Sequence, residues 1–85
     1  MFVAIRIEPT SEFVKSTKKL DKVLKLKLRK QIEKIVTNPD TGKPLRHLRG
    51  ERTLYVKPFR IIYSYNKLED ILYLLKFEHR DSVYQ

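Results

Sequence analysis

The chain has 85 residues and a formal net charge of +9, from nineteen lysines and arginines against ten aspartates and glutamates. A chain this short buries only about two-thirds of its unfolded surface, so we expect one domain over residues 1–85, with one sheet and one helical layer. The lack of cysteine excludes disulfides and thiolate metal sites, and two histidines without an acidic cluster argue against zinc. No apolar stretch approaches the roughly 20 residues that span a bilayer. We therefore expect a soluble, cytoplasmic protein that uses no metal, no membrane and no small-molecule cofactor.

The positive charge indicates an anionic partner. Self-repulsion of this size destabilises a small folded domain, and a nucleic acid, an acidic protein or an anionic membrane surface would offset it. The alternative is a lysine-rich surface of the kind found in thermophile proteins.

The first half of the chain predicts a strand followed by helices. Apolar and polar residues alternate over Phe2–Glu8, and Pro9 ends the strand. Thr10 or Ser11 can cap a helix, and leucines and isoleucines then recur at helical spacing as far as Val36. We expect a break near residues 19–21, with Asp21 capping a second helix and the two helices forming an antiparallel pair.

A basic loop is predicted over Thr37–Gly50, where two prolines and two glycines interrupt any regular pattern. Its Lys43, Arg46 and Arg49 are candidates for contacts with RNA phosphates. The Gly42–Lys43 pair is not a phosphate-binding P-loop, because it lacks the upstream glycine and the following serine or threonine.

Three strands are predicted in the second half, over Thr53–Lys57, Phe59–Asn66 and Asp70–His79, as an antiparallel meander. The order β-α-α-β-β-β predicts an α+β fold, with two N-terminal helices packed on one face of a twisted antiparallel sheet. The N-terminal strand could join this sheet at an edge or beside a central strand.

Strand periodicity also predicts which side chains share a face. Arg60 shares one face of its strand with Ile62 and Ser64, at the rim of the core. By the same alternation, His79 follows the face of Phe77, Leu75, Tyr73 and Ile71.

The side chains suited to catalysis are mostly cations. There is no Ser–His–acid set, no cysteine and no paired carboxylate of the kind that a Mg²⁺-dependent nuclease needs. What remains at the strand ends is a group of basic residues and one phenol: Arg52, Lys57, Arg60, His79, Arg80 and Tyr84. Such a group suits metal-free RNA cleavage, in which the ribose 2′-hydroxyl attacks its own phosphate, arginine stabilises the added charge, and histidine, tyrosine or lysine moves protons.

Each of these residues also has a structural alternative. Arg60 could pair with Glu51 or Glu78, His79 could lie at the core rim, and Tyr84 could hold the tail against the sheet. Lys57 and Arg52 could be solvated charges at strand edges. An Arg60 guanidinium that is buried, neutralised by a carboxylate and distant from the histidine and phenol would indicate a protein that binds its target without cutting it.

Three segments together resemble the RelE/ParE toxin superfamily, and in particular its short RelE-type members: GKPLRHLRG, YVKPFRIIYSY and HRDSVY. The resemblance covers nearly the whole chain. It implies a metal-independent endoribonuclease that cuts mRNA in the ribosomal A site, in contact with rRNA, and a RelB-like antitoxin that wraps and inhibits it.

The resemblance also implies residue roles. Arg60 matches the arginine that binds the scissile phosphate, and Lys57 falls among the basic residues of the preceding strand. His79 and Arg80 match the basic pair before the tail, and Tyr84 matches the C-terminal tyrosine.

The chain departs from the family pattern in the short link at Lys57–Phe59 and in the residues after GKP. Leu45 and Arg46 stand there, where some relatives have a glutamate base, so no base is evident. Two other functions stay open: a ParE-type poison of DNA gyrase, and a basic module that binds RNA or the ribosome without catalysis.

Overall fold

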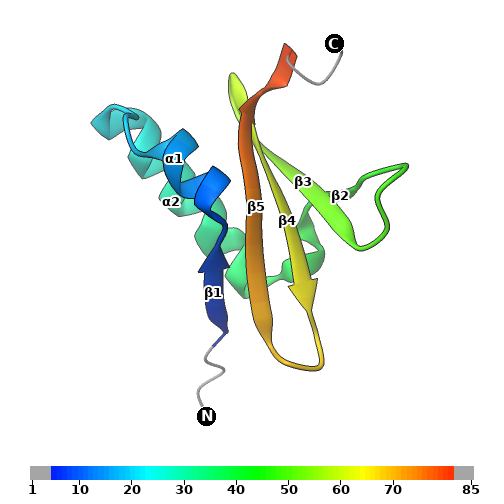
Figure 1. Cartoon of the computed structure of the whole chain (residues 1–85). Coiled ribbons are helices and arrows are strands. Elements are labelled where there is room, and N and C mark those ends of the chain that lie inside the picture. The colour runs from blue at the N-terminus through cyan, green and yellow to red at the C-terminus, as the bar shows by residue number, and fades with distance from the viewer. Residues whose placement is uncertain (1–4, 82–85) are drawn as a thin grey trace.

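The computed structural model describes residues 5–81, and it confirms the predicted α+β class (Figure 1). In chain order the elements are β1 (Arg6–Pro9), α1 (Ser11–Thr17), α2 (Lys22–Thr37), the 3-10 helix η1 (Pro39–Thr41), β2 (Lys43–Pro44), β3 (Glu51–Val56), β4 (Phe59–Asn66) and β5 (Ile71–His79). The short β2 lies in the segment that was predicted as loop. Strand β3 begins two residues earlier than expected.

The five strands form one sheet in the order β1-β5-β4-β3-β2. The antiparallel meander β3-β4-β5 is confirmed. Strand β1 joins at one edge and runs parallel to β5, which settles the position that the sequence left open. Strand β2 pairs antiparallel with β3 at the other edge.

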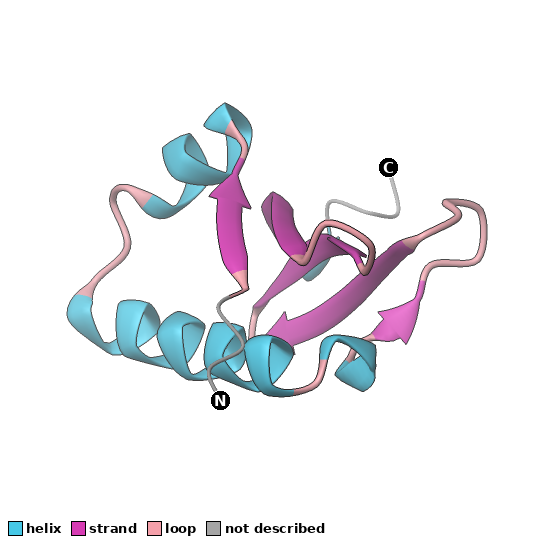
Figure 2. Cartoon of the chain, turned by 90° about the horizontal axis from the view of Figure 1, so that it is seen from below, coloured by secondary structure: helices cyan, strands magenta, loops and turns pink. Residues whose placement is uncertain are grey.

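Both predicted helix caps are present. The Thr10 side chain accepts a hydrogen bond from the Phe13 N–H at 3.1 Å, and the Asp21 carboxylate accepts one from the Leu24 N–H at 2.8 Å. The expected break between the helices is therefore confirmed. Helix α1 packs mainly on β5 and α2 mainly on β3, so each helix is held chiefly by a strand rather than by the other helix (Figure 2).

The core lies between the helices and one face of the sheet. Its side chains are large and almost fully buried, with Tyr63, Ile35 and Ile61 at 0% exposed. The members of this core are Phe13, Leu28, Ile35, Val56, Ile61, Tyr63, Leu72, Leu74 and Phe77.

A β-bulge at Leu75 divides β5 into two segments of opposite alternation. On β4, Ile62 pairs with Lys76 and the next residue, Tyr63, pairs with Leu74, so Leu75 is the extra residue. The core face of β5 therefore carries odd-numbered residues after the bulge and even-numbered ones before it. The expected continuous alternation from Ile71 to His79 is wrong for this reason.

The bulge also fixes the start of α1. The Thr10 N–H donates to the Leu74 carbonyl at 3.0 Å, and the Thr10 hydroxyl donates to the Leu75 carbonyl at 2.7 Å. Thr10 thus has two roles. Its side-chain oxygen caps α1, and its N–H and hydroxyl donate hydrogen bonds to the two carbonyls at the bulge.

Tyr63 ties the loop after α2 to the sheet. Its hydroxyl donates to the Pro39 carbonyl at 2.7 Å and accepts from the Gly42 N–H at 2.9 Å. Burial raises the pKa of Tyr63, which favours the protonated form that makes both bonds. A Cβ atom at Gly42 would lie 2.6 Å from that hydroxyl and 2.8 Å from the Thr53 carbonyl oxygen, so only glycine fits.

Within residues 5–81, no helix combines the length and the apolar character needed to cross a membrane.

We predict that Tyr63→Phe lowers the free energy of unfolding by about 1–3 kcal/mol, because the buried Gly42 N–H loses its acceptor. Urea denaturation would measure the change, and the same substitution at the half-buried Tyr73 is the matched control. Equal effects at the two positions would contradict the assigned role of the Tyr63 hydroxyl.

Candidate functional site

The sheet face turned away from the helices, which we call the open face, collects charged side chains in the register of the strands. Paired residues on neighbouring strands point to the same side. Tyr55 pairs with Arg60, and Arg60 pairs with Glu78, so these three form a row across β3, β4 and β5. Their neighbours along the strands, Val56 and Phe77, belong to the core on the other face.

Arg60 is the most enclosed of these charges. Its side chain is 12% exposed, and its Nη2 lies 3.5 Å from Oε2 of Glu78 in an ion pair. Its Nε is buried without a hydrogen-bond partner among the described residues. The structure therefore realises one alternative raised by the sequence, the pair with Glu78, while part of the donor capacity of the guanidinium stays unused.

Arg80 reaches the same region from the end of β5. Its guanidinium carbon lies 5.7 Å from the centre of the Tyr55 ring, a cation–π contact. The Arg80 N–H donates to the Pro58 carbonyl at 2.9 Å, which fixes the chain beside the β3–β4 turn. Because Tyr55 is the register partner of Arg60, this contact brings a second arginine to the open face.

Two lysines extend the positive charge of the open face. In the strand register, Lys43 pairs with Thr53, Thr53 with Ile62, and Ile62 with Lys76. The exposed Lys43 and Lys76 therefore lie at the two ends of one row of side chains across the sheet. Lys43 was a sequence candidate, whereas Lys76 was missed. Its alternation with the apolar Phe77 is the sequence signal that could have found it.

His79 lies on the opposite side of the sheet from Arg60. It pairs with Phe59, and the two rings are 5.4 Å apart in a T-shaped contact beside the core. Its Nδ1 accepts a hydrogen bond from the Asp81 N–H at 3.2 Å and lies 3.8 Å from the Asp81 carboxylate. The structure thus does not bring His79 and Arg60 together. The other expected proton donor, Tyr84, lies outside the described residues.

Lys57 borders a shallow groove between β3 and α2. The groove has a volume of about 330 Å³ and is lined by Lys27, Lys30, Gln31, Lys34, Tyr55, Val56 and Lys57. The Gln31 amide donates to the Tyr55 carbonyl at 2.7 Å and joins the two walls. Four lysines along one groove give a row of charge that suits the phosphate backbone of a nucleic acid.

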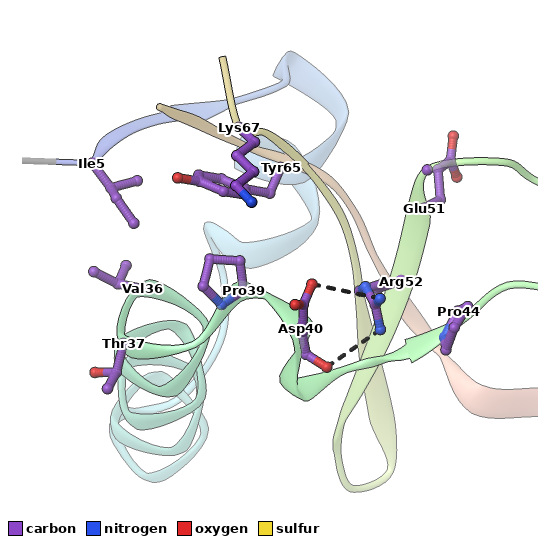
Figure 3. Close-up of a pocket in the computed structure, with 11 residues that line it drawn as sticks. Ile5, Val36, Thr37, Pro39, Asp40, Pro44, Glu51, Arg52, Tyr65 and Lys67 are labelled. Atoms are coloured by element: carbon purple, nitrogen blue, oxygen red, sulfur yellow. Dashed lines mark hydrogen bonds and ion pairs between the residues drawn. The ribbon is translucent and has the colours of Figure 1, made fainter. Parts of the chain in front are cut away.

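Arg52 braces the loop after α2 from the core side of the sheet. Its Nη1 donates to the Gly42 carbonyl at 2.7 Å and to the Asp40 carbonyl at 3.3 Å, and its Nη2 lies 3.5 Å from the Asp40 carboxylate (Figure 3). Arg52 pairs with Tyr63, so it lies on the opposite face from Arg60. The structure places this sequence candidate with the loop rather than with the basic open face.

The Arg52–Asp40 pair lines the largest pocket described, of about 710 Å³. Its other walls are mostly apolar, from Ile5, Val36 and Pro39, with Tyr65 and Lys67 across from them (Figure 3). A hydrogen bond to Asp70, followed by burial, raises the pKa of Tyr65 and favours its neutral form. Of these groups, Arg52 pairs with Asp40 and Tyr65 bonds to Asp70 outside the pocket lining.

Arg46 and Arg49 are exposed in the loop between β2 and β3. The loop is closed at its base by two backbone bonds, from the Leu45 N–H to the Glu51 carbonyl at 2.9 Å and from the Glu51 N–H to the Leu48 carbonyl at 3.1 Å. Both arginines are thereby displayed to solvent near β2.

A search of residues 5–81 for three or more histidine, aspartate or glutamate side chains able to hold a metal ion finds none.

Residues 7–84 match the family model described as the ParE toxin of the type II toxin–antitoxin system, parDE. The chain belongs to this family. A comparison with curated protein sequences finds no match.

Solved structures of RelE toxins share the fold. The toxin chain of the intact E. coli RelBE toxin–antitoxin complex superposes with a TM-score of 0.80 at 15% identity, covering 89% of this chain and 96% of that one. The isolated E. coli RelE toxin gives 0.78 at 17% identity, with 95% and 92% covered. The archaeal RelE–RelB complex from Pyrococcus horikoshii gives 0.74 at 18% identity, with 92% and 97% covered. These likenesses confirm the RelE/ParE architecture, and the chain is a toxin-type member of that superfamily.

We predict that Arg52→Ala lowers the free energy of unfolding by about 1–2 kcal/mol, because the loop loses charge-assisted hydrogen bonds. The matched control is Arg46→Ala, which removes an exposed arginine of the next loop and should change stability by less than about 0.5 kcal/mol. Urea unfolding of both variants tests the assignment. Unchanged stability in Arg52→Ala with weakened RNA binding would restore the nucleic-acid role.

Proposed function

We propose that the chain is the toxin of a type II toxin–antitoxin module and acts as an endoribonuclease that cuts mRNA in the ribosomal A site without a metal ion. The observation that supports this most is the row Tyr55–Arg60–Glu78 with Arg80 above it, on the open face. It combines phosphate-binding cations, a carboxylate and a phenol, which are the groups that transesterification of RNA needs.

In this proposal Arg60 binds the scissile phosphate and stabilises the charge that builds up on it. Arg80 supplies a second positive charge beside it. Lys57, with the lysines of the adjoining groove, holds the RNA backbone or the rRNA around the A site, and Lys43, Arg46 and Arg49 extend that contact. His79 takes no part in proton transfer while its ring lies against Phe59. Tyr84, at the end of the chain, stays a proposed participant.

A net charge of +9 and the family membership support two macromolecular partners. One is the ribosome with its mRNA and rRNA, which would place the protein in the cytoplasm. The other is a RelB-like antitoxin, because several structures with this fold are complexes of a RelE toxin with RelB.

Two other functions have an observation in their favour. The ion pair of Arg60 with Glu78 favours a module that grips RNA or the ribosome without cutting, since a neutralised arginine binds phosphate less strongly. The name of the matching family model favours a ParE-type poison of DNA gyrase.

We predict that translating ribosomes incubated with the protein acquire discrete mRNA 5′ ends at A-site codons, which primer extension maps. Arg60→Ala should lower the cleavage rate by roughly 2–4 kcal/mol in barrier, on the scale of a lost oxyanion donor, with a smaller effect on ribosome binding. The matched control is Arg6→Ala, which removes an exposed arginine from the edge strand β1 and should leave the cuts unchanged.

Each alternative has its own outcome in the same assay. Intact mRNA with salt-sensitive ribosome binding would indicate the non-catalytic module. Intact mRNA together with trapped gyrase–DNA complexes would indicate the gyrase poison.

A further inference from the structure

We infer that Glu78 is the general base of the cleavage reaction, taking the proton from the attacking ribose 2′-hydroxyl. This inference rests on the proposed ribonuclease function, and it assigns the proton acceptor that the sequence left open among histidine, tyrosine and lysine. The sequence indicates Glu78 only as an ion-pair partner of Arg60, and the geometry points to a second use for the same contact.

The distance between the two side chains supports this role. Glu78 Oε2 lies 3.5 Å from Arg60 Nη2. A phosphate held by that guanidinium has its oxygens about 2.8 Å from the same nitrogens. The 2′-oxygen that attacks must stand about 3–3.5 Å from the phosphorus. A carboxylate beside the phosphate-binding nitrogen is therefore within hydrogen-bonding range of the nucleophile.

The way the pair is formed leaves the Glu78 carboxylate available. A bidentate arginine–carboxylate pair would occupy two parallel N–H donors at less than about 3 Å. Here the contact is 3.5 Å, and Arg60 Nε has no hydrogen-bond partner among the described residues. The Glu78 side chain is 26% exposed, so RNA can reach it from solvent.

Other carboxylates on the open face are too distant from Arg60 to serve. Glu51 pairs with Ser64, four residues further along β4 than Arg60, or about 13 Å at the usual rise of a strand. Glu8 pairs with Tyr73, at the same level of the sheet as Ser64. By register Arg60 lies beside Glu78, and Lys76 and Arg80 lie two residues away along the chain on the same face; all three are hydrogen-bond donors.

The step that follows is a balanced transesterification. Glu78 takes the 2′-hydroxyl proton while the 2′-oxygen forms a bond to phosphorus. The bond from phosphorus to the 5′-oxygen breaks, and that oxygen takes a proton from water. Glu78 then returns its proton to the solvent. The products are a 2′,3′-cyclic phosphate and a 5′-hydroxyl end, with no oxidant, metal ion or co-substrate consumed.

The test compares Glu78→Gln and Glu78→Ala with the unaltered protein on translating ribosomes, with thermal melts to check folding. We expect both variants to cut about 100- to 10,000-fold more slowly, the usual loss for a general base. Ribosome binding should stay within a few-fold of the unaltered protein. Added formate should restore part of the activity of Glu78→Ala, whereas equimolar chloride should not, because chloride can neutralise Arg60 but is too weak a base to accept the proton. The matched control is Glu33→Gln, on the exposed side of α2.

The failures are distinguishable. If the unaltered protein cuts and Glu78→Gln cuts equally fast or faster, Glu78 only restrains Arg60 and the inference is overturned while the ribonuclease function stands. Equal rescue by chloride and formate would likewise reduce Glu78 to a neutralising charge. If the unaltered protein makes no cuts, the proposed function fails, and the role of Glu78 fails with it.

Discussion

The bulge at Leu75 is the constraint on which the rest of the arrangement depends. A strand without it would alternate from Ile71 to His79, so that Phe77 and Leu74 could not both point into the core. The extra residue turns Leu72 and Leu74 toward the helices together with Phe77, and it leaves Lys76 and Glu78 on the open face. The carbonyls at the bulge are in turn bound by Thr10, so the feature that sorts charged from apolar side chains also determines where α1 begins.

The positively charged side chains of this chain have two different roles. Arg52 stabilises a loop through three contacts with Asp40 and Gly42, which is a structural use of a positive charge. Arg60 is nearly as well enclosed as a core residue, and a buried arginine without a counter-ion would cost about 3–5 kcal/mol. A carboxylate opposite Arg60 is thus needed in the resting fold whatever the function. On its own, this ion pair is also what a protein that binds its target without cutting it would show.

Much of the architecture followed from local chemistry. Prolines, caps and strand alternation predicted the breaks at Pro9 and Asp21 and the bounds of β4, because each depends on a few neighbouring residues. The site was harder, because it depends on which strands lie together and in what register. Arg60 was identified by its place at a strand start, but Lys76 was missed and His79 was expected on a continuous face that the bulge interrupts. Strand β2 has only two residues, too few to show the alternation of apolar and polar residues that predicts a strand.

The hydrogen bond from the Gly42 N–H to the Tyr63 hydroxyl lies between two segments of different character, the constrained loop after α2 and the exposed turn between β2 and β3. At Gly42 the path is constrained, because a Cβ atom there would lie 2.6 Å from the Tyr63 hydroxyl. Beyond β2, the turn that carries Arg46 and Arg49 closes on its own backbone bonds, and Gly50 at its end has open space around it. Charge changes at the exposed Arg46 and Arg49 would alter the surface of this turn without disturbing the sheet, whereas Gly50, at φ +80°, favours glycine.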